Sequence, residues 1–245
     1  MKSRAAKSSA ILAVLLSLFA AGCASADNKE AAAADDPLEP TNRAVFRFNQ
    51  SLDRNAALPV ASFYASTVPN PLRTGVHNFL SNLDGPVDAA NSMLQVHFDE
   101  AGTALGRFTV NSTIGVGGIF DVATGWGMPD RNEDFGQTLG YYGVGQGPYL
   151  VLPLRGPSAV RDFAGSYIDG YFSPLYYVHY NGRQYVGLVR ASLGSVDNRS
   201  ANIMTFREIE RSSVDFYATM RDYYRQRREA AIRNGKPDMD NLPDL

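Results

Sequence analysis

Signals for the start of a helix recur along this chain. They occur at Asp36-Pro37-Leu38-Glu39, Asn70-Pro71, Gly85-Pro86, Asp99-Glu100, Gly156-Pro157 and Thr205-Phe206-Arg207-Glu208. A capping side chain such as Asp36, followed by proline at the first helical position, favours a helix because the proline ring already holds the helical φ angle. Repeated starts of this kind restrict the chain to a fold built mainly of helices.

The apolar residues between these starts also follow a helical spacing. The sets that share a face are Val45, Phe48 and Leu52, and then Phe206, Ile209, Phe216, Met220 and Tyr223. Sustained alternation of apolar and polar residues is hard to find, and Tyr149 to Leu152 is the one good strand candidate. The sequence therefore predicts a mostly α-helical single domain over residues 37–233, with one short hairpin or extended element near 141–154.

The N-terminal residues indicate an export signal. Lys2, Arg4 and Lys7 precede an apolar run over residues 10–21, which is shorter than the roughly 20 residues needed to cross a bilayer. Residues 1–22 are therefore predicted to be a signal peptide. The run ends at Ala20-Ala21-Gly22-Cys23, which resembles a bacterial lipoprotein box whose cysteine is lipidated.

Cys23 is the only cysteine of the chain, and use as a lipid anchor explains a lone cysteine in an exported protein. A rival cleavage site exists at Ala24-Ser25-Ala26. In lipoprotein signals of this type, a residue other than aspartate after the cysteine implies delivery to the outer membrane, and here that residue is Ala24. We expect a protein that is lipid-anchored on the periplasmic side of the outer membrane.

Composition and charge divide the chain further. Residues 23–36 are small and charged, which predicts a flexible tether, and residues 234–245 form a tail rich in proline and aspartate. Removing residues 1–22 takes away three positive charges and no negative ones, so the net charge changes from −2 to −5. An acidic chain is a poor candidate for nucleic acid, and a hydrophobic content of 44% excludes general disorder.

No motif for catalysis, metal binding or a cofactor is present. The histidines His77, His97 and His179 are scattered without metal-ligand spacing. Asp130, Asn132 and Asp134 imitate the first ligands of a calcium loop, but Phe135 and Tyr141 stand where glycine and an acid are needed. No Gly-x-Ser-x-Gly elbow occurs. We therefore expect a protein that is not an enzyme and that needs no cofactor.

The glycines Gly143, Gly145 and Gly147 stand between tyrosines and lead into Pro148 and Tyr149. A phosphate loop needs a helix after its glycines and, in the Walker type, a lysine, and no lysine lies between residues 136 and 182. We predict that the glycines serve backbone shape; if Gly145 has φ > 0, valine there strains the loop. Two interpretations stay open: a hairpin lying against lipid or lining a passage, and an ordinary surface turn.

Four motifs in one order resemble the MlaA (VacJ) family of outer-membrane lipoproteins. They are Asp36-Pro37-Leu38-Glu39-Pro40-Thr41-Asn42-Arg43, Phe108-Thr109-Val110-Asn111-Ser112-Thr113-Ile114-Gly115, Glu133-Asp134-Phe135-Gly136-Gln137-Thr138-Leu139-Gly140 and Tyr142-Gly143-Val144-Gly145-Gln146-Gly147-Pro148-Tyr149. The last helix adds Asp215-Phe216-Tyr217 and Arg221-Asp222-Tyr223-Tyr224. Thr41 departs from the family, whose members often have an aromatic residue there.

The resemblance implies a ring-shaped helical domain lying in the outer membrane and associated with a trimeric porin. It implies an amphipathic channel that removes mislocalised phospholipids from the outer leaflet, passes them to a periplasmic lipid carrier and so maintains lipid asymmetry. The alternatives are an envelope lipid hydrolase and a structural porin-associated lipoprotein.

Two sets of residues are candidates for contact with lipid. Asp162, Gly165, Ser166 and Asp169 share one face of a helix, and this stripe is the candidate channel wall, with an ordinary solvated face as the other interpretation. The glycines 143, 145 and 147 with Tyr149 are placed beside the same path. The arginines Arg221, Arg225 and Arg228 also share a face, for which a solvated helix end is favoured over contact with lipid head groups.

Overall fold

The computed structural model describes residues 36–177 and 183–234; Cys23, the predicted signal peptide and tether, His179 and residues 235–245 lie outside them. The helices up to the hairpin are α3 (Glu39–Leu52), the π-helix η2 (Asp53–Ala57), α4 (Leu58–Thr67), α5 (Asn70–Asn82), α6 (Gly85–Leu94), α7 (Phe98–Thr113), α8 (Val122–Gly125) and α9 (Phe135–Tyr141). The remaining elements are β1 (Tyr149–Leu152), β2 (Gly156–Ala159), α10 (Val160–Phe172), the 3-10 helix η3 (Pro174–Tyr176), α11 (Arg183–Ala201), α12 (Ile203–Ser212) and α13 (Phe216–Ile232).

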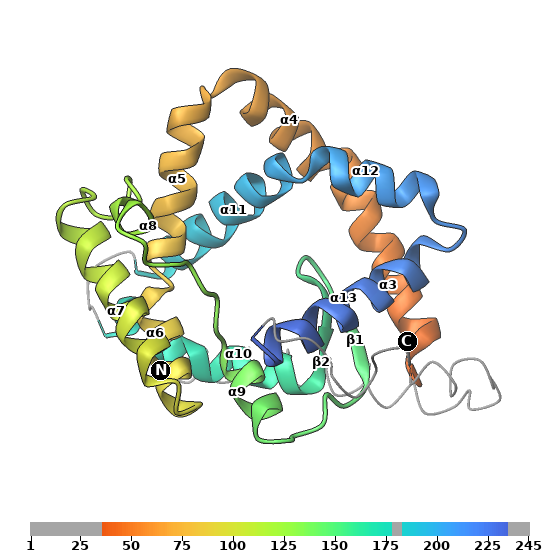
Figure 1. Ribbon diagram of the computed structural model, residues 1–245. Helices are drawn as coiled ribbons and strands as arrows, with labels where there is room; N and C mark the ends of the chain where they lie inside the picture. Colours follow the sequence, from red (N-terminus) through yellow and green to blue (C-terminus); the bar gives the residue numbers. More distant parts are fainter. Residues whose placement is uncertain (1–35, 178–182, 235–245) are drawn as a thin grey trace, which may run out of the picture.

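These helices follow one another in a ring (Figure 1). The circuit runs from α3 through η2, α4 and α5, reaches α6 and α7, and returns through α9, α10 and the hairpin. Helix α11 packs along α4 and α5, and α13 contacts both α9 and the hairpin. The predicted fold class, a mostly helical ring with one short hairpin, is confirmed.

The sequence predicts correctly the starts of the two helices α5 and α6, which are marked by proline. Helix α5 begins at Asn70 and α6 at Gly85, each with proline in its first turn. Helix α7 begins at Phe98, one residue before the predicted acidic start. Helix α12 begins at Ile203, so the predicted start at Thr205 lies inside it.

The predicted cap at Asp36 is wrong. Helix α3 begins at Glu39 without a side-chain cap, and the Asp36 carboxylate is fully buried against α13. It accepts a hydrogen bond of 2.9 Å from Asn42 Nδ2 and one from the Tyr217 hydroxyl. Its second carboxylate oxygen lies 3.5 Å from Arg221 Nη1. The Asp36 carboxylate therefore joins α3 to α13 and does not accept from the free N–H groups at the start of α3.

The predicted helix start at Gly156-Pro157 is also wrong, because these residues form the second strand of a hairpin. Strands β1 and β2 pair antiparallel, with Tyr149 opposite Ala159 and Leu152 opposite Gly156. Gly156 has φ of +86°, a value at which glycine avoids the steric cost of a side chain. The hairpin itself confirms the extended element predicted from the apolar run.

A small apolar cluster lies where α3, the hairpin and α13 meet. Its buried members are Phe46, Tyr149, Val151, Tyr217 and Met220. Asn42 fixes the hairpin to α3 because its side-chain amide donates to the Tyr149 carbonyl and its side-chain oxygen accepts from the Val151 N–H, both at 2.9 Å. These bonds satisfy one edge of the isolated two-stranded sheet.

Of the two predicted apolar faces, the one on α3 differs from the buried side of its helix. On α3 the buried apolar residue is Phe46, whereas Phe48 and Leu52 are 55% and 38% exposed. The second predicted face spans two helices, since α12 ends at Ser212 and α13 begins at Phe216. Its members nevertheless point inward, because Met220 is buried and Ile209 and Phe216 pack against the apolar cluster. Apolar periodicity therefore identifies the interior side of α12 and α13, but not that of α3.

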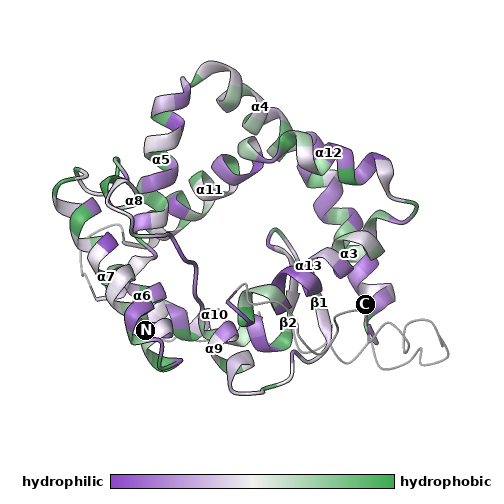
Figure 2. Ribbon diagram, viewed as in Figure 1, coloured by the Kyte–Doolittle hydropathy of each residue, from purple (hydrophilic) through white to green (hydrophobic). Residues whose placement is uncertain are grey.

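In this ring the usual distribution of side chains in a water-soluble domain, apolar inside and polar outside, is reversed. More polar and charged residues than apolar ones are buried among the described residues. Large apolar side chains are exposed on helices around the whole ring, including Phe63 (69%), Leu72 (62%), Phe98 (64%), Phe120 (60%) and Leu188 (64%). Figure 2 shows hydrophobic residues on every side of it. None of the helices in the described ranges is both long and apolar enough to cross a membrane.

Candidate functional site

Helix α10 carries the predicted polar stripe, and its aspartates point into contacts with other helices. Asp162 Oδ1 accepts hydrogen bonds of 3.0 Å from Arg228 Nη2 and from Arg161 Nε, and Oδ2 accepts one from the Tyr224 hydroxyl. Arg228 also pairs with Asp134, which begins α9. Asp162 is thus one member of an ion-pair network that joins α9, α10 and α13.

Asp169 lies two turns further along α10 and joins it to α6 and α9. Its Oδ1 accepts hydrogen bonds of 2.9 Å from the Asn91 side chain and from the Phe135 N–H. Burial raises the pKa of Asp169 to about 6, although these two donors oppose the shift. Asp169 carries no arginine partner of its own in the described part of the chain, in contrast to Asp162.

The small residues of the stripe allow close contact between helices. A Cβ atom on Gly165 would lie 2.5 Å from the Gly136 nitrogen, so only glycine fits where α10 crosses α9. Ser166 accepts a hydrogen bond of 3.0 Å from Arg155 Nη1 on the hairpin turn. The stripe therefore packs against the ring's own elements. Its role beside a lipid path stays a prediction.

The glycine loop precedes the hairpin and turns twice through left-handed backbone. Gly143 and Gly147 have φ of +81° and +69°, whereas Gly145 does not have a positive φ. Arg161 supports the loop by donating to the Val144 carbonyl at 3.0 Å. Tyr149 is 1% exposed and belongs to the apolar cluster. The predicted use of glycine for backbone shape fits two of the three glycines.

Arg221 and Arg228 of α13 do not form a solvated face. Arg221 is 9% exposed and lies beside Asp36 and Asp222. Arg228 pairs with two carboxylates. Burial lowers the pKa of Arg228, but its bonds to Asp134 and the charges of Asp134 and Asp162 outweigh this effect, so the net shift is upward. The prediction of a solvated helix end is wrong for both residues, because each charge is matched by carboxylates inside the ring.

The histidines in the described ranges hold helix contacts. His77 Nδ1 lies 2.9 Å from an Asp197 carboxylate oxygen, and His97 Nδ1 lies 3.1 Å from Asn234 Nδ2. Within the part of the chain that the structure describes, no three His, Cys, Asp or Glu residues are grouped so that they could hold a metal ion.

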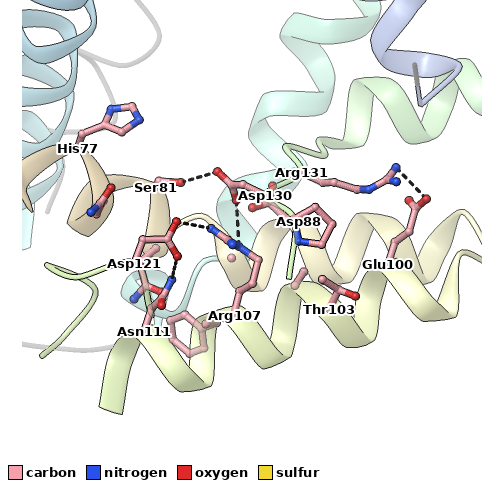
Figure 3. A pocket seen from close by; sticks show the side chains of 16 residues that line it. His77, Ser81, Asp88, Glu100, Thr103, Arg107, Asn111, Asp121, Asp130 and Arg131 are labelled. Atoms are coloured by element: carbon pink, nitrogen blue, oxygen red, sulfur yellow. Dashed lines mark hydrogen bonds and ion pairs between the residues drawn. The ribbon is translucent and has the colours of Figure 1, made fainter. Parts of the chain in front are cut away.

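A polar pocket of about 240 Å³ lies between α5, α6, α7 and the segment that follows α8 (Figure 3). Arg107 reaches into it from α7 and is held by Asp121 at 3.1 Å, by Asp130 at 3.3 Å and by the Met128 carbonyl at 2.6 Å. Arg131 pairs with Glu100 at 2.9 Å across the same pocket. These arginines are already paired, so the pocket walls are held together by their own charges.

Asp88 forms part of this pocket's wall and is 7% exposed. Its Oδ1 accepts a hydrogen bond of 2.9 Å from the Glu133 N–H. Burial, together with the neighbouring carboxylates of Asp84 and Asp130, raises the pKa of Asp88 to about 8, although the bond from the Glu133 N–H opposes the shift. Sequence reasoning missed Asp88 and Arg107, although Arg107 directly precedes the Phe108-Thr109-Val110-Asn111 motif.

A second, mostly apolar pocket of about 300 Å³ lies on the other side of the ring. It is enclosed by α3 and η2, by the end of α11 with α12 and α13, and by the turn between β1 and β2. Its apolar lining comes from Phe46, Leu52, Ala57, Leu154, Phe206, Phe216 and Met220. The sequence did not predict this pocket, because its walls come from segments far apart in the chain.

A helical ring that buries polar side chains and exposes large apolar ones has the surface of a protein that works against an apolar partner, either a membrane or another protein. A family model described as MlaA lipoprotein matches residues 34–231. The chain belongs to the MlaA lipoprotein family, as the sequence motifs predicted.

Relatives and a solved structure agree with this assignment. The intermembrane phospholipid transport system lipoprotein MlaA of Haemophilus influenzae is 33% identical over 97% of this chain and 97% of the relative. The protein of the same name from Escherichia coli K12 is 34% identical over 88% of this chain and 85% of the relative. An uncharacterized protein of Rickettsia bellii is 37% identical over 82% of this chain and 78% of its own length.

The solved structure comes from work on the structural basis for maintenance of bacterial outer membrane lipid asymmetry. It superimposes on this ring with a TM-score of 0.73 and 32% sequence identity, and the match covers 80% of this chain and 98% of that chain.

Proposed function

We propose that this protein is an outer-membrane lipoprotein that transports phospholipid between the membranes of the cell envelope and so maintains lipid asymmetry. The relatives from H. influenzae and E. coli carry the name of an intermembrane phospholipid transport lipoprotein. Membership of their family, over nearly the whole described chain, supports the same role here. A transport role requires no catalytic residue.

The observation that carries this proposal is the reversed burial of the ring. Exposed side chains such as Phe63, Leu72 and Phe120 would be costly in water and are stabilised by contact with acyl chains. Buried Asn91 and Gln95 form hydrogen bonds that join α6 and its end to α10 and to Glu133, which precedes α9. Such bonds keep the ring together where apolar packing supplies little energy. Both features suit a ring that lies within a membrane surface.

In finer detail, we propose that phospholipid passes through an amphipathic channel in the middle of the ring, from the outer leaflet to a periplasmic lipid carrier, with a trimeric porin as the neighbour of the ring. Gly143, Gly145, Gly147 and Tyr149 shape the hairpin side of this path. The α10 residues Asp162, Gly165 and Asp169 support the wall through their contacts with α6, α9 and α13, and Ser166 supports it through its bond to Arg155 on the hairpin turn.

Purified lipoprotein in phospholipid vesicles tests the proposal against its alternatives. A transport protein passes intact labelled phospholipid from the vesicle to a soluble lipid carrier. A hydrolase releases free fatty acid from the same vesicles, and a structural lipoprotein does neither. The proposal requires carrier-bound intact lipid that depends on the lipoprotein; fatty acid release, or no transfer at all, would contradict it.

A further inference from the structure

The apolar pocket has paired charges along its margin. Asp53 accepts two hydrogen bonds from Arg199, at 2.7 and 2.9 Å, and Arg54 pairs with Glu210. Arg155 also borders the pocket, and among the described residues it has no carboxylate partner. The margin therefore has one uncompensated positive charge, beside an interior lined by leucine, phenylalanine and methionine.

Arg155 stands on a turn that is held firmly in place. Asn49 of α3 donates from its side-chain amide to the Leu152 carbonyl and accepts from the Leu154 N–H, both at 2.9 Å. Leu154 has φ of +66° and is 75% exposed. A leucine in this conformation is strained, and it persists only where surrounding contacts impose it. Asn49 provides those contacts, so the turn keeps a fixed position.

The same turn projects toward the middle of the ring (Figure 1). It therefore places an exposed apolar side chain, Leu154, next to an exposed cation, Arg155, at the mouth of an apolar pocket. A ligand that fits this arrangement has an apolar part and an anionic group joined to it. An arginine guanidinium recognises phosphate oxygens well because its N–H groups form a planar fork.

We infer that the pocket binds one acyl chain of a phospholipid while Arg155 binds its phosphate, an inference that rests on the proposed transport function and names one subsite for its substrate. The chain enters between α3 and α12 and displaces water from apolar walls, which favours binding. The phosphate stays at the mouth, where Arg155 exchanges its bond to Ser166 for bonds to phosphate oxygens. This subsite holds a lipid at the inner edge of the ring.

Photo-crosslinking measures where the acyl chain lies. A phospholipid with a diazirine near the end of one acyl chain is added to the purified full-length lipoprotein in detergent, and adducts are mapped by peptide mass spectrometry. The expected adducts concentrate on the pocket residues of α3, α12 and α13. Adducts confined to other parts of the ring would overturn the inference.

Filling the pocket should exclude the acyl chain. Ala57→Phe on η2 and Ser195→Phe on α11 each place a ring in the pocket and should lower its adducts about tenfold, the effect of excluding roughly two methylene groups. The matched controls Ala56→Phe and Ser192→Phe lie on the same helices but do not line the pocket. If one filling variant does not fold, the test rests on the other one. Unchanged adducts on the pocket residues in a folded filling variant would contradict the proposed subsite.

The role of Arg155 is tested by changing the lipid as well as the protein. Arg155→Gln should lower phospholipid adducts about tenfold, since a hydrogen bond to a charged group is lost, and should leave adducts of a diacylglycerol with the same chains unchanged. Arg47→Gln, an exposed arginine of α3, serves as control. Equal loss with both lipids would show that Arg155 only shapes the pocket.

The vesicle assay distinguishes failure of the proposed subsite from failure of the proposed transport function. Normal transfer of intact lipid to the carrier by a filling variant, together with adducts outside the pocket, overturns the subsite and leaves the transport function standing. No transfer by the unmodified protein, with no lipid adducts on it, overturns the transport function itself.

Discussion

At the scale of single residues, Asp88 is a carboxyl group that the fold withdraws from water. Burial raises its pKa from 3.8 to about 8, against a hydrogen bond from the Glu133 N–H. Because its native pKa lies above its unfolded pKa, the native state binds more protons than the unfolded state between these values. The stabilising contribution of Asp88 is therefore complete below pH 3.8 and is lost as the pH rises to about 8.

Asp88→Asn should flatten this pH dependence, because asparagine keeps an oxygen for the Glu133 N–H and does not ionise. Denaturant unfolding in detergent at about pH 5 and about pH 8 measures the difference. The unmodified protein should be less stable at the higher pH, and the variant should lose less. The exposed Asp99→Asn is the control. An unchanged pH dependence in Asp88→Asn would show that Asp88 does not cause it.

Arg228 shows how a buried charge network stabilises the ring. Its side chain is 13% exposed and pairs with Asp134 and Asp162. Arg228→Ala should lower the free energy of unfolding by about 3 kcal/mol, because the Asp162 carboxylate, 9% exposed, and the Asp134 carboxylate, 32% exposed, lose their cation. The exposed neighbour Arg227→Ala should change it little. Equal stability of the two variants in denaturant titrations would count against the network.

The same network changes what is expected of the predicted channel aspartates. Replacing Asp162 and Asp169 by leucine is a direct test of the predicted channel wall. Asp162→Leu also removes one of the two carboxylates of Arg228 and the acceptor of the Tyr224 hydroxyl. A loss of transport in that variant therefore needs a stability measurement beside it before it is assigned to the lipid path.

At the scale of elements, the glycines before β1 show whether a glycine is needed for its φ angle or for lack of room for a side chain. Cβ atoms on Gly143 and Gly145 would both meet nothing within 4 Å, but only Gly143 has a positive φ. Gly143→Val should therefore strain the loop by about 1–3 kcal/mol. Gly145→Val should be tolerated, which replaces the expectation from sequence that Gly145 is the sensitive position.

Thermal unfolding and the vesicle transfer assay distinguish these two loop variants. The expected result is lower stability or slower transfer for Gly143→Val and values close to the unmodified protein for Gly145→Val. The reverse order would mean that the loop conformation in the membrane differs from the one described.

Local sequence signals predicted where helices begin more reliably than which side of each helix is buried. Proline at Pro71 and Pro86 fixes φ wherever it stands, so the starts of α5 and α6 were predictable. Gly156-Pro157 has the same local signal but forms a strand, because Tyr149 to Leu152 pairs with it. Pairing between distant segments overrides a local preference, and a short window of sequence does not contain it.

The candidate site was less predictable than the fold. A hydrophobic stripe normally points to the core because water surrounds the rest of a protein. Phe48 and Leu52 break this rule on α3, where the most buried positions are Asn42 and Phe46. Asp36, Arg221 and Arg228 were assigned to a cap or a solvated face because sequence does not show which charges meet across a ring.

At the scale of the whole molecule, the exposed apolar surface should bind membranes even without the lipid anchor. A Cys23→Ser protein is expected to sediment with phospholipid vesicles, and adding Phe63→Glu and Leu72→Glu should lower the bound fraction, since both residues are more than half exposed. Ser62→Glu and Thr74→Glu add the same charges at exposed polar positions of the same helices. Equal binding of both double variants would contradict this role.

The anchor itself is a prediction about residues outside those described. Mass spectrometry of the mature N-terminus should show a lipidated Cys23, because buried acyl chains contribute about 0.8 kcal/mol for each methylene and make attachment nearly permanent. A mature chain that begins at Asp27 would refute it and would support the rival cleavage site.

The burial of Asp36 affects how the ring responds to load. The ends of a domain usually loosen first, but Asp36, which precedes α3, is held inside the protein by Tyr217 and Arg221 of α13. The two ends of the hoop are therefore fastened to each other. If the predicted Cys23 anchor pulls on the residues before Asp36, the tension is shared between α3 and α13 at this contact. A ring whose first helix is joined to α13 in this way opens first at a contact between two other helices, and not by fraying at the first turn of α3.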